Sequence, residues 1–313
     1  MNKSIVIGTR GSRLARTQAS LIASLLRKHF PSVAIEERII VTEGDKLAGR
    51  VPSATSDKGL FTRAIERELL DKTVDVAVHS YKDLPTDLPQ GLCIGAVLER
   101  GPVEDALVSP LVQSLDDLPS GSRVGVGGIR RAAQLRRLRT DIIVAGIQGN
   151  VDTRLKKMDA GDFDAIILAR AGMLRLDLGG RIACIFEPTA WYHAVGQGAL
   201  AIEIREGDAS VAEIVGSVDH APTRMQTDAE RSFLHGLGGG CLVPVGVRGS
   251  ISLQHLSLGG MVCGFDGAPF LEDEENGAPS DAREIGRRLA DKLLQKGAAD
   301  VLSAVRVRQG STI

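Results

Sequence analysis

The chain has 313 residues, of which 43% are hydrophobic, and its 38 basic and 39 acidic residues give a formal net charge of -1. This length is enough for two or three domains, because single hydrophobic cores stop growing near ~250–300 residues. The near-neutral balance excludes a general binder of nucleic acid or of anionic membranes, which would need a surplus of basic residues. Any anion must therefore be bound by local clusters of arginine and lysine.

The hydropathy of the chain and its cysteines indicate the compartment. No segment approaches the ~18 consecutive apolar residues of a membrane-spanning helix, and the first residues run directly into a strand-like segment rather than a signal-peptide core. We therefore expect a cytoplasmic protein without membrane contact, whose four cysteines stay reduced. No pair of cysteines has the C-x-x-C spacing of a zinc or redox site, so we expect no metal.

Apolar runs of strand length alternate with segments of helical period through the first two thirds of the chain, which predicts α/β layers. In order, we expect a strand at 4–8, a helix from the N-cap Ser12 to about 28, a strand at 33–41, a polar loop at 42–57, a helix at 59–71 and a strand at 74–78. A second set over about 104–195 holds strands at 123–126, 142–145 and 164–168, and helices at 129–138 and from about 151. The polar loop is too long for a simple connection, and such loops are often functional lids.

The pattern changes after about residue 217. A helix at 222–236 is followed by a glycine loop at 238–240, by three strand-like runs between 243 and 265, and by a last helix near 281–296. Strands that follow one another directly favour an antiparallel sheet. We therefore expect a separate, smaller α+β domain at the C-terminal end.

Cys241 is set apart from the other three cysteines. It follows directly on the glycine loop, whereas Cys93 and Cys184 lie in apolar runs and Cys263 lies in a strand-like segment. A thiol on a glycine-rich loop is accessible, and accessibility is one condition for reactivity. The pattern alone leaves both a reactive and a purely structural thiol open at this position.

Four polar groups follow the ends of predicted strands, where open α/β sheets bind their ligands. They are Thr9-Arg10-Gly11-Ser12, Lys82-Asp83, Arg130-Arg131 and the stretch 150–154, which ends in Arg154. Helix N-termini expose unpaired N–H groups, and arginines placed there bind anions strongly. Two interpretations are open: a cleft that gathers several carboxylates or phosphates, which the equivalent positions favour, and surface charges that cap helices.

Asp83 is the one acid directly beside a basic residue in these strand-end loops. A carboxylate surrounded by cations stays ionised, and it would then stabilise a developing cation or hold a substrate N–H group. An ordinary surface pair with Lys82 is the alternative. The glycines of 125–128 do not complete a dinucleotide-binding fingerprint, because the last glycine that it needs is replaced by Arg130.

Several longer motifs together resemble those of the porphobilinogen deaminase (hydroxymethylbilane synthase) family over nearly the whole chain. They are Gly8-Thr9-Arg10-Gly11-Ser12, Lys58-Gly59-Leu60-Phe61, DVAVHSYKDLP at 75–85, GNVDTRL at 149–155, DFDAIILA at 162–169, AVGQGA at 194–199 and GGCLVPVG at 239–246. The resemblance implies an α/β fold with two lobes like those of periplasmic binding proteins and a smaller C-terminal α+β domain. The implied divisions are 1–100 with 198–216 for domain 1, 101–197 for domain 2 and 217–313 for domain 3, the cofactor-attachment domain.

The resemblance also implies a transferase of porphyrin, tetrapyrrole and heme biosynthesis. Such an enzyme condenses four porphobilinogen units, with loss of ammonia, on a dipyrromethane cofactor that would be thioether-linked to Cys241. Asp83 would be the catalytic residue, since it would hold pyrrole N–H groups and offset the positive charge of the substrate cation. Porphobilinogen would be the binding partner, without nucleic acid, and we expect a monomer.

Further binding residues follow from the same resemblance. The implied cofactor-binding residues besides Cys241 are Lys82, Arg130, Arg131, Arg154 and Ser12, and the implied substrate-binding residues are Arg10, Gln18, Arg175 and Gln197. Lys58 and Phe61 would belong to the loop that covers the cleft.

The chain departs from the family pattern at three places. Val126-Gly127-Gly128 stands where the family usually has Thr-Ser-Ser, Gln148 where it has arginine, and Gly238 where it has glutamate. The first two lie on the expected carboxylate-binding surface, so we expect weaker carboxylate binding there. Two alternatives to an ordinary family member stay open: a divergent paralogue with altered product length or substrate, and a non-catalytic pyrrole-binding protein.

Overall fold

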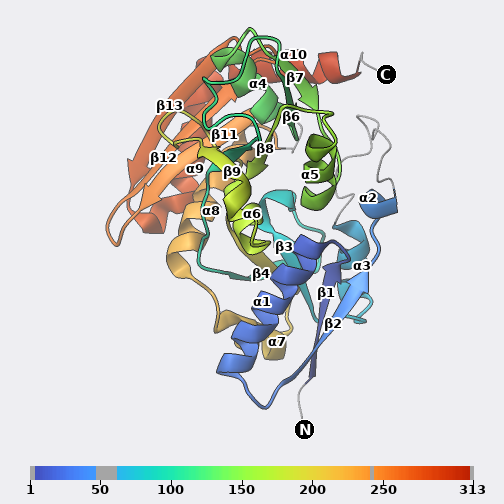
Figure 1. Cartoon of the computed structure of the whole chain (residues 1–313). Helices are drawn as coiled ribbons and strands as arrows, with labels where there is room; N and C mark the ends of the chain where they lie inside the picture. Colours follow the sequence, from blue (N-terminus) through green and yellow to red (C-terminus); the bar gives the residue numbers. More distant parts are fainter. Residues whose placement is uncertain (1–3, 47–61, 240–242, 311–313) are drawn as a thin grey trace.

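The computed structural model describes residues 4–46, 62–239 and 243–310, and it has three parts: two α/β lobes and a third unit of one sheet with helices (Figure 1). The first lobe holds a five-stranded sheet of order β2-β1-β3-β10-β4. Its strands are β1 (Ser4–Arg10), β2 (Ala34–Ile40), β3 (Val76–Ser80), β4 (Leu92–Val97) and β10 (Leu200–Arg205). The first three run parallel, and β10 is antiparallel to both of its neighbours.

The second lobe repeats this arrangement with the order β7-β6-β8-β5-β9. Its strands are β5 (Asp105–Val108), β6 (Arg123–Val126), β7 (Ile143–Gly146), β8 (Ala165–Ala169) and β9 (Ile182–Ile185). Here β6, β7 and β8 run parallel, and β5 is antiparallel to both of its neighbours. The antiparallel strand of each sheet follows a strand of the other sheet in sequence, so the chain crosses between the lobes over 98–104 and again over 186–199.

Helices connect the parallel strands and set the positions of the strand-end loops. They are α1 (Arg13–His29), α2 (Glu43–Lys46) and α3 (Arg63–Leu70) in the first lobe, α4 (Ile129–Leu138), α5 (Val151–Asp159) and α6 (Arg170–Arg175) in the second, and α7 (Ala209–Gly216) after β10. Ser12 is the N-cap of α1, as its sequence predicts, and its hydroxyl accepts a hydrogen bond from the Ala15 amide over 3.3 Å. The buried face of α1, with Ile22 and Leu26, packs on Ile5 of β1 in the first core.

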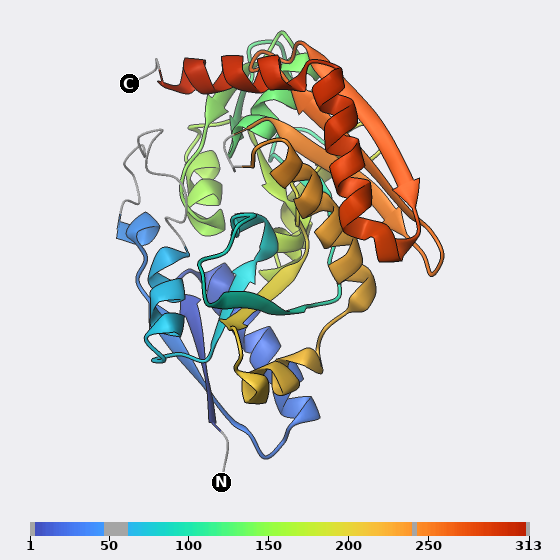
Figure 2. The same ribbon diagram turned by 180° about the vertical axis from the view of Figure 1, so that it is seen from behind.

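The third unit is an antiparallel sheet covered by helices, which α8 (Ala221–Gly236) joins to the first lobe (Figure 2). Its strands, in spatial order, are β11 (Val245–Ile251), β12 (Leu256–Cys263) and β13 (Phe270–Gly277), and its further helices are α9 (Ala282–Gln295) and α10 (Ala298–Gly310). The core between sheet and helices contains Phe233, Leu258 and Leu289. In the described part of the chain, no helix is long and apolar enough to cross a bilayer.

Among the elements that differ from the sequence-based expectation are β13, α2 and α10. The range 243–265 holds two strands, and the third strand, β13, lies beyond it. The sequence pattern missed β13 because its half-buried positions include Asp273 and Glu275. These acids pair with Lys296, just after α9, and with Lys292 of α9. The short helix α2 lies within the expected loop, where the Thr42 hydroxyl accepts a hydrogen bond from the Asp45 amide. The helix α10 was not expected, because its apolar residues do not gather on one face.

Candidate active site

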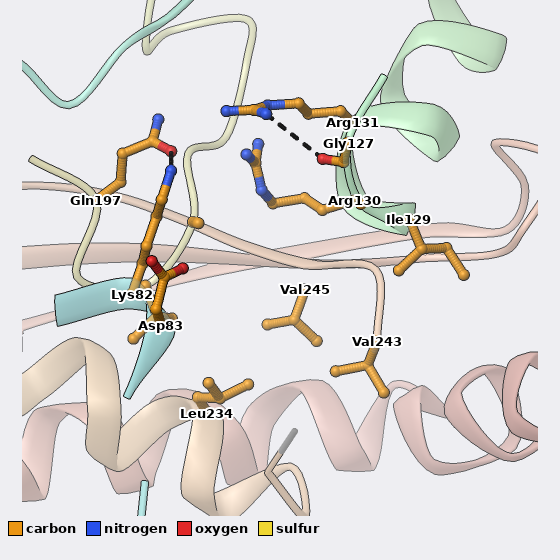
Figure 3. Close-up of a pocket in the computed structure, with 13 residues that line it drawn as sticks. Lys82, Asp83, Gly127, Ile129, Arg130, Arg131, Gln197, Leu234, Val243 and Val245 are labelled. Carbon is orange, nitrogen blue, oxygen red and sulfur yellow. Dashed lines mark hydrogen bonds between the residues drawn. The ribbon is translucent and has the colours of Figure 1, made fainter. Parts of the chain in front are cut away.

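A cavity of about 210 Å³ opens where the two lobes and the third unit meet. Its lining consists of Lys82, Asp83, Gly127, Gly128, Ile129, Arg130, Arg131, Ala194, Val195, Gln197, Leu234, Val243 and Val245. Figure 3 shows the lysine, the glutamine and the two arginines on one side and Leu234, Val243 and Val245 on the other. A polar wall with cations that faces an apolar wall suits a flat ring that carries carboxylates.

The end of β3 positions Lys82 and Asp83. The buried strand continues into a single turn over Tyr81–Asp83, in which the Tyr81 side chain is buried. Lys82 Nζ donates a hydrogen bond to Oε1 of Gln197 over 3.2 Å, and the Asp83 carboxylate is exposed to the cavity (Figure 3). Burial, together with the positive charge of Arg131, lowers the pKa of Lys82 to about 8.

The start of α4 positions Arg130 and Arg131, and the buried carboxylate of Asp105 holds both side chains. Arg130 Nη2 donates to Asp105 Oδ2 over 2.8 Å, and Arg131 Nη2 donates to Asp105 Oδ1 over 2.6 Å. The indole N–H of Trp191 adds a bond of 2.8 Å to the same carboxylate. Burial alone would raise the pKa of Asp105, but Arg130 and Arg131 hold it well below its usual value.

Asp105 was not among the residues that the sequence predicted for the site. It begins the short apolar strand β5, and its partners in the structure lie 25 or more residues away along the chain. The available signal was an acid at the start of an otherwise apolar run, where a buried carboxylate needs cationic partners. Asp105 reaches these partners because β5 lies inside the second-lobe sheet, between β8 and β9.

Gln197 connects the two cationic groups. Its Oε1 accepts from Lys82, while its Nε2 donates to Asp105 Oδ1 over 2.9 Å and to the Val103 carbonyl over 2.7 Å. The neighbouring backbone is fixed by Arg100, which donates to the Gln197 carbonyl over 2.9 Å and forms a two-bond ion pair with buried Glu230. Both crossings between the lobes therefore contribute to the same hydrogen-bond network.

Arg154 lies beside the cavity on α5, whose N-cap is Asn150. Its Nε donates to the Gly149 carbonyl over 2.8 Å, and its guanidinium lies against Gly127. Burial, with the nearby charge of Arg131, lowers the pKa of Arg154 to about 10, and Asp83 opposes this shift. Arg154 is therefore close enough to both of these residues to share their electrostatic environment.

The glycines that replace hydroxyl-bearing residues have structural causes here. Gly128 has a φ of 96°, a left-handed conformation that serine adopts only with strain. Any Cβ at Gly127 would collide with the Arg154 guanidinium. The Arg154 guanidinium therefore occupies the space beside Gly127, whereas Gly128 is required by its backbone conformation. Gly238 also has a positive φ, of 85°.

Gln148 lies at an exposed position after β7, where its carbonyl accepts a hydrogen bond from Lys157 Nζ over 3.3 Å. It is not among the residues that line the cavity.

Besides Arg154, four of the predicted binding residues lie outside the cavity lining. Ser12 caps α1, and Gln18 exchanges hydrogen bonds with the Ser80 hydroxyl at the end of β3. Arg10 forms an ion pair with Asp45, and Arg175 donates to the Gly198 carbonyl over 2.6 Å. Their binding roles stay predictions.

Three further predicted residues, Lys58, Phe61 and Cys241, lie outside the described residues. The described residue Val243, two positions after Cys241, lines the cavity.

Two family models match this chain. One, described as "Porphobilinogen deaminase, dipyromethane cofactor binding domain", matches residues 5–213, and "Porphobilinogen deaminase, C-terminal domain" matches residues 225–295. Among solved structures, the periplasmic VFT2 domain of Bordetella pertussis BvgS is 13% identical with a TM-score of 0.41 and covers 69% of this chain and 86% of its own. A nutrient binding protein from Burkholderia cenocepacia is 12% identical with a TM-score of 0.41 and covers 67% of this chain and 90% of its own.

Curated relatives match at higher identity. The porphobilinogen deaminase of Desulforudis audaxviator is 43% identical over 98% of this chain and 99% of its own length. Those of Syntrophomonas wolfei and Moorella thermoacetica are also 43% identical, over 97% and 98% of this chain and 99% and 98% of their own lengths. Matches of this identity and extent leave one conclusion: the chain belongs to the porphobilinogen deaminase family.

Proposed function

We propose that this protein is a hydroxymethylbilane synthase, which condenses porphobilinogen units with release of ammonia on a dipyrromethane cofactor in tetrapyrrole biosynthesis. The observation that carries this proposal is the family match over nearly the whole chain, with Lys82, Asp83 and the two arginines of α4 around one cavity. The retained acid favours an enzyme over a pyrrole-binding protein, because a binder has no need for a group that stabilises a cation.

The cavity fits a cofactor that carries several carboxylates. Arg131 Nε is buried and lacks a hydrogen-bond partner among the described residues, so this N–H is available to an anion. Lys82 and Arg154 supply further positive charge, and Val243 and Val245 offer an apolar surface for a pyrrole ring. In this proposal Cys241 holds the cofactor through a thioether, and the arginines bind its acetate and propionate groups.

The chemistry requires a nucleophilic carbon and a stabilised cation. The cofactor, when bound, supplies the free α-carbon of a pyrrole as the nucleophile. Asp83 accepts hydrogen bonds from pyrrole N–H groups and offsets the positive charge that forms on porphobilinogen as its C–N bond breaks and ammonia leaves. Lys82, held by Gln197, orients a carboxylate beside this acid.

The other predicted residues take supporting roles in the same proposal. Carboxylates of the substrate or cofactor are bound by Arg10, Ser12, Gln18 and Arg175, and they replace the intramolecular hydrogen-bond partners that these side chains have in the structure. The cleft is covered by the loop that contains Lys58 and Phe61. The three domains are 1–100 with 198–216, 101–197 and 217–313, of which the first is consistent with β10 lying in the first sheet. The protein acts as a monomer in the cytoplasm.

The intact mass of the purified holoprotein tests the proposal. Protein made in cells that supply porphobilinogen should exceed its sequence mass by one dipyrromethane and should react with Ehrlich's aldehyde reagent for pyrroles. Cys241→Ala should lose both signals, whereas the control Cys93→Ala, at a half-buried thiol in the first lobe, should keep them. An unmodified wild type, or a holoprotein that consumes no porphobilinogen, would contradict the proposed function.

A further inference from the structure

We infer that Arg231 of α8 is a positioning residue for Asp83: its guanidinium holds the backbone directly after Asp83 and thereby sets where that carboxylate lies in the cavity. Arg231 is not among the residues that line the cavity, so it acts through the turn that carries Asp83. The inference rests on the proposed function and deepens it, because it gives a helix of the third unit a part in placing the catalytic carboxylate.

The backbone after Asp83 needs hydrogen-bond donors. Residues 84–86 belong to no helix or strand, so their carbonyls have no partners from regular secondary structure. Arg231 Nη1 donates to the Leu84 carbonyl over 3.3 Å. Arg231 Nη2 donates to the Pro85 carbonyl over 2.5 Å and to the Thr86 carbonyl over 3.1 Å. No other side chain in the described ranges donates to these carbonyls, so one guanidinium holds three successive peptide groups.

The same guanidinium contacts the chain before Asp83. It lies over the ring of Tyr81, with Cζ 4.6 Å from the ring centroid. Burial raises the pKa of Tyr81, and the positive charge of Arg231 opposes this shift. Arg231 therefore contacts the backbone or side chains on both sides of Asp83. A planar group with several donors can stack on a ring and bind carbonyls at once, which an ammonium group cannot do.

The end of α8 and the backbone after it contact the same segment. His235 lies one helical turn after Arg231, and its Nε2 is 3.3 Å from Asp87 Oδ1. A Cβ added at Gly239 would lie 3.2 Å from Thr86 Oγ1, so the glycine loop packs against this segment. The turn with the catalytic carboxylate is thus docked beside the loop that, in the proposed function, leads to the cofactor thiol.

A second arginine makes contacts of the same kind away from the cavity. Arg139 follows α4, and it donates from Nη1 to the Leu115 carbonyl over 2.6 Å and from Nη2 to the Leu118 carbonyl over 2.7 Å. None of these residues lines the cavity. Arg139 is therefore a matched control for what the loss of such contacts does to stability alone.

The experiment compares Arg231→Gln and Arg231→Lys with Arg139→Gln, each as holoprotein whose intact mass shows the cofactor. We expect Arg231→Gln to lower kcat for porphobilinogen about tenfold to a hundredfold and to change KM about threefold or less, because a displaced carboxylate stabilises the cation poorly while carboxylate binding persists. Arg231→Lys should keep more activity, because lysine still donates to the carbonyls. Arg139→Gln should lower the unfolding temperature but change neither constant.

A double-mutant cycle with Asp83→Asn tests whether Arg231 acts through Asp83. In the Asp83→Asn background, Arg231→Gln should change the single-turnover rate by less than about twofold. The full loss in that background, an unchanged kcat in Arg231→Gln, or an equal loss of kcat in Arg139→Gln would overturn the inference.

Hydrogen exchange tests the clamp without turnover. The Leu84 amide donates to the Tyr81 carbonyl over 3.3 Å, and peptides that cover 81–88 should exchange faster in Arg231→Gln than in wild type or Arg139→Gln. Equal exchange in all three proteins would contradict the role of Arg231. A wild type that consumes no porphobilinogen, although Arg231→Gln speeds this exchange, would contradict the proposed function and not the clamp.

Discussion

The ammonium group of Lys82 donates a hydrogen bond to Oε1 of Gln197 over 3.2 Å, and this bond joins the end of β3 to the segment by which the chain returns from the second lobe to the first. Through its amide nitrogen, Gln197 also binds Asp105, which in turn holds Arg130 and Arg131. The cations of the two lobes are therefore positioned by one continuous chain of hydrogen bonds, and several predictions about charge and pH depend on it.

Substrate binding should weaken at alkaline pH because of Lys82. Its pKa of about 8 means that the cation that binds a carboxylate is lost as the pH rises above that value. We expect kcat/KM to fall up to about tenfold between pH 7 and pH 9, the contribution of one charge-assisted hydrogen bond. Lys82→Arg should move this decline to higher pH, because arginine stays protonated there. An alkaline limb that is identical in wild type and Lys82→Arg would assign the decline to another group.

Asp83→Asn should abolish most turnover while the fold persists. Removal of an oriented charge from an enzyme site commonly costs ~10²–10³ in kcat. Asp83→Glu should keep more activity than Asp83→Asn, because the negative charge matters more than its exact reach. Single-turnover rates with porphobilinogen and the unfolding temperature would check both expectations. Near-normal turnover in the asparagine variant would rule out Asp83 as the carboxylate that stabilises the substrate cation.

Asp105→Asn should destabilise the protein as well as the site, because two buried guanidinium groups lose their common counter-charge. Removing one partner of a buried ion pair costs about 3–5 kcal/mol of the free energy of unfolding. Urea denaturation would measure this loss. The control Asp141→Asn should leave stability almost unchanged, since Asp141 pairs with Arg139 at the surface. An equal effect of the two substitutions would contradict the central position of Asp105.

Gln148→Arg should increase porphobilinogen binding only modestly. An arginine there adds a cation near the carboxylate-binding wall, but the position is exposed, and exposed ion pairs contribute about 0.2–1 kcal/mol. We therefore expect KM to fall by no more than about fivefold. Steady-state kinetics and the number of pyrroles bound per chain would measure the effect. A gain far larger than this would mean that residue 148 reaches the substrate in a closed conformation.

Acid should destabilise the protein through His193, which is 1% exposed. Burial lowers the pKa of His193 from 6.5 to about 4, although Glu230 opposes this shift. The histidine of the unfolded chain binds a proton more readily than the buried one does. The free energy of unfolding therefore falls by up to about 3 kcal/mol as the pH drops from 6.5 toward about 4. Denaturation curves at pH 7, 6 and 5 should show a shallower decline for His193→Gln than for wild type. The exposed residue His255 provides the control, and His255→Gln should leave the pH dependence unchanged.

The prediction from sequence was most accurate where the determining interactions are local. The predicted limits of the α4 helix, 129–138, agree with the structure, and Ser12 caps α1 as expected. Both features depend on residues within one or two turns, such as the glycine before α4 and the hydroxyl before α1. Because the start of α4 was predicted correctly, Arg130 and Arg131 lie at a helix N-terminus, where anion binding was predicted.

The strand β13 and the residue Asp105 show where sequence patterns failed. The half-buried acids of β13 are stabilised by Lys292 and Lys296, which lie 17 or more residues after the acids that they pair with. The sequence of β13 therefore lacks the apolar alternation of a strand. Asp105 and Gln197 are 92 residues apart in the sequence. They meet because the chain crosses between the lobes just before β5 and again just before β10, the antiparallel strands of the two sheets. The sequence marks Asp105 only as an acid at the start of an apolar run, and it does not identify the distant partners of either group.

The sequence by itself determined the alternating α/β layers, the caps of the main helices and the residue types at the strand ends, because periodicity and capping depend on neighbours along the chain. Only the tertiary structure decided which of these charges meet. The two crossings bring Asp105 between two arginines, and the packing of α5 lays Arg154 on Gly127. Electrostatic and steric energies depend on separations of a few ångströms, and those separations are set by how the sheets and helices pack rather than by spacing in sequence.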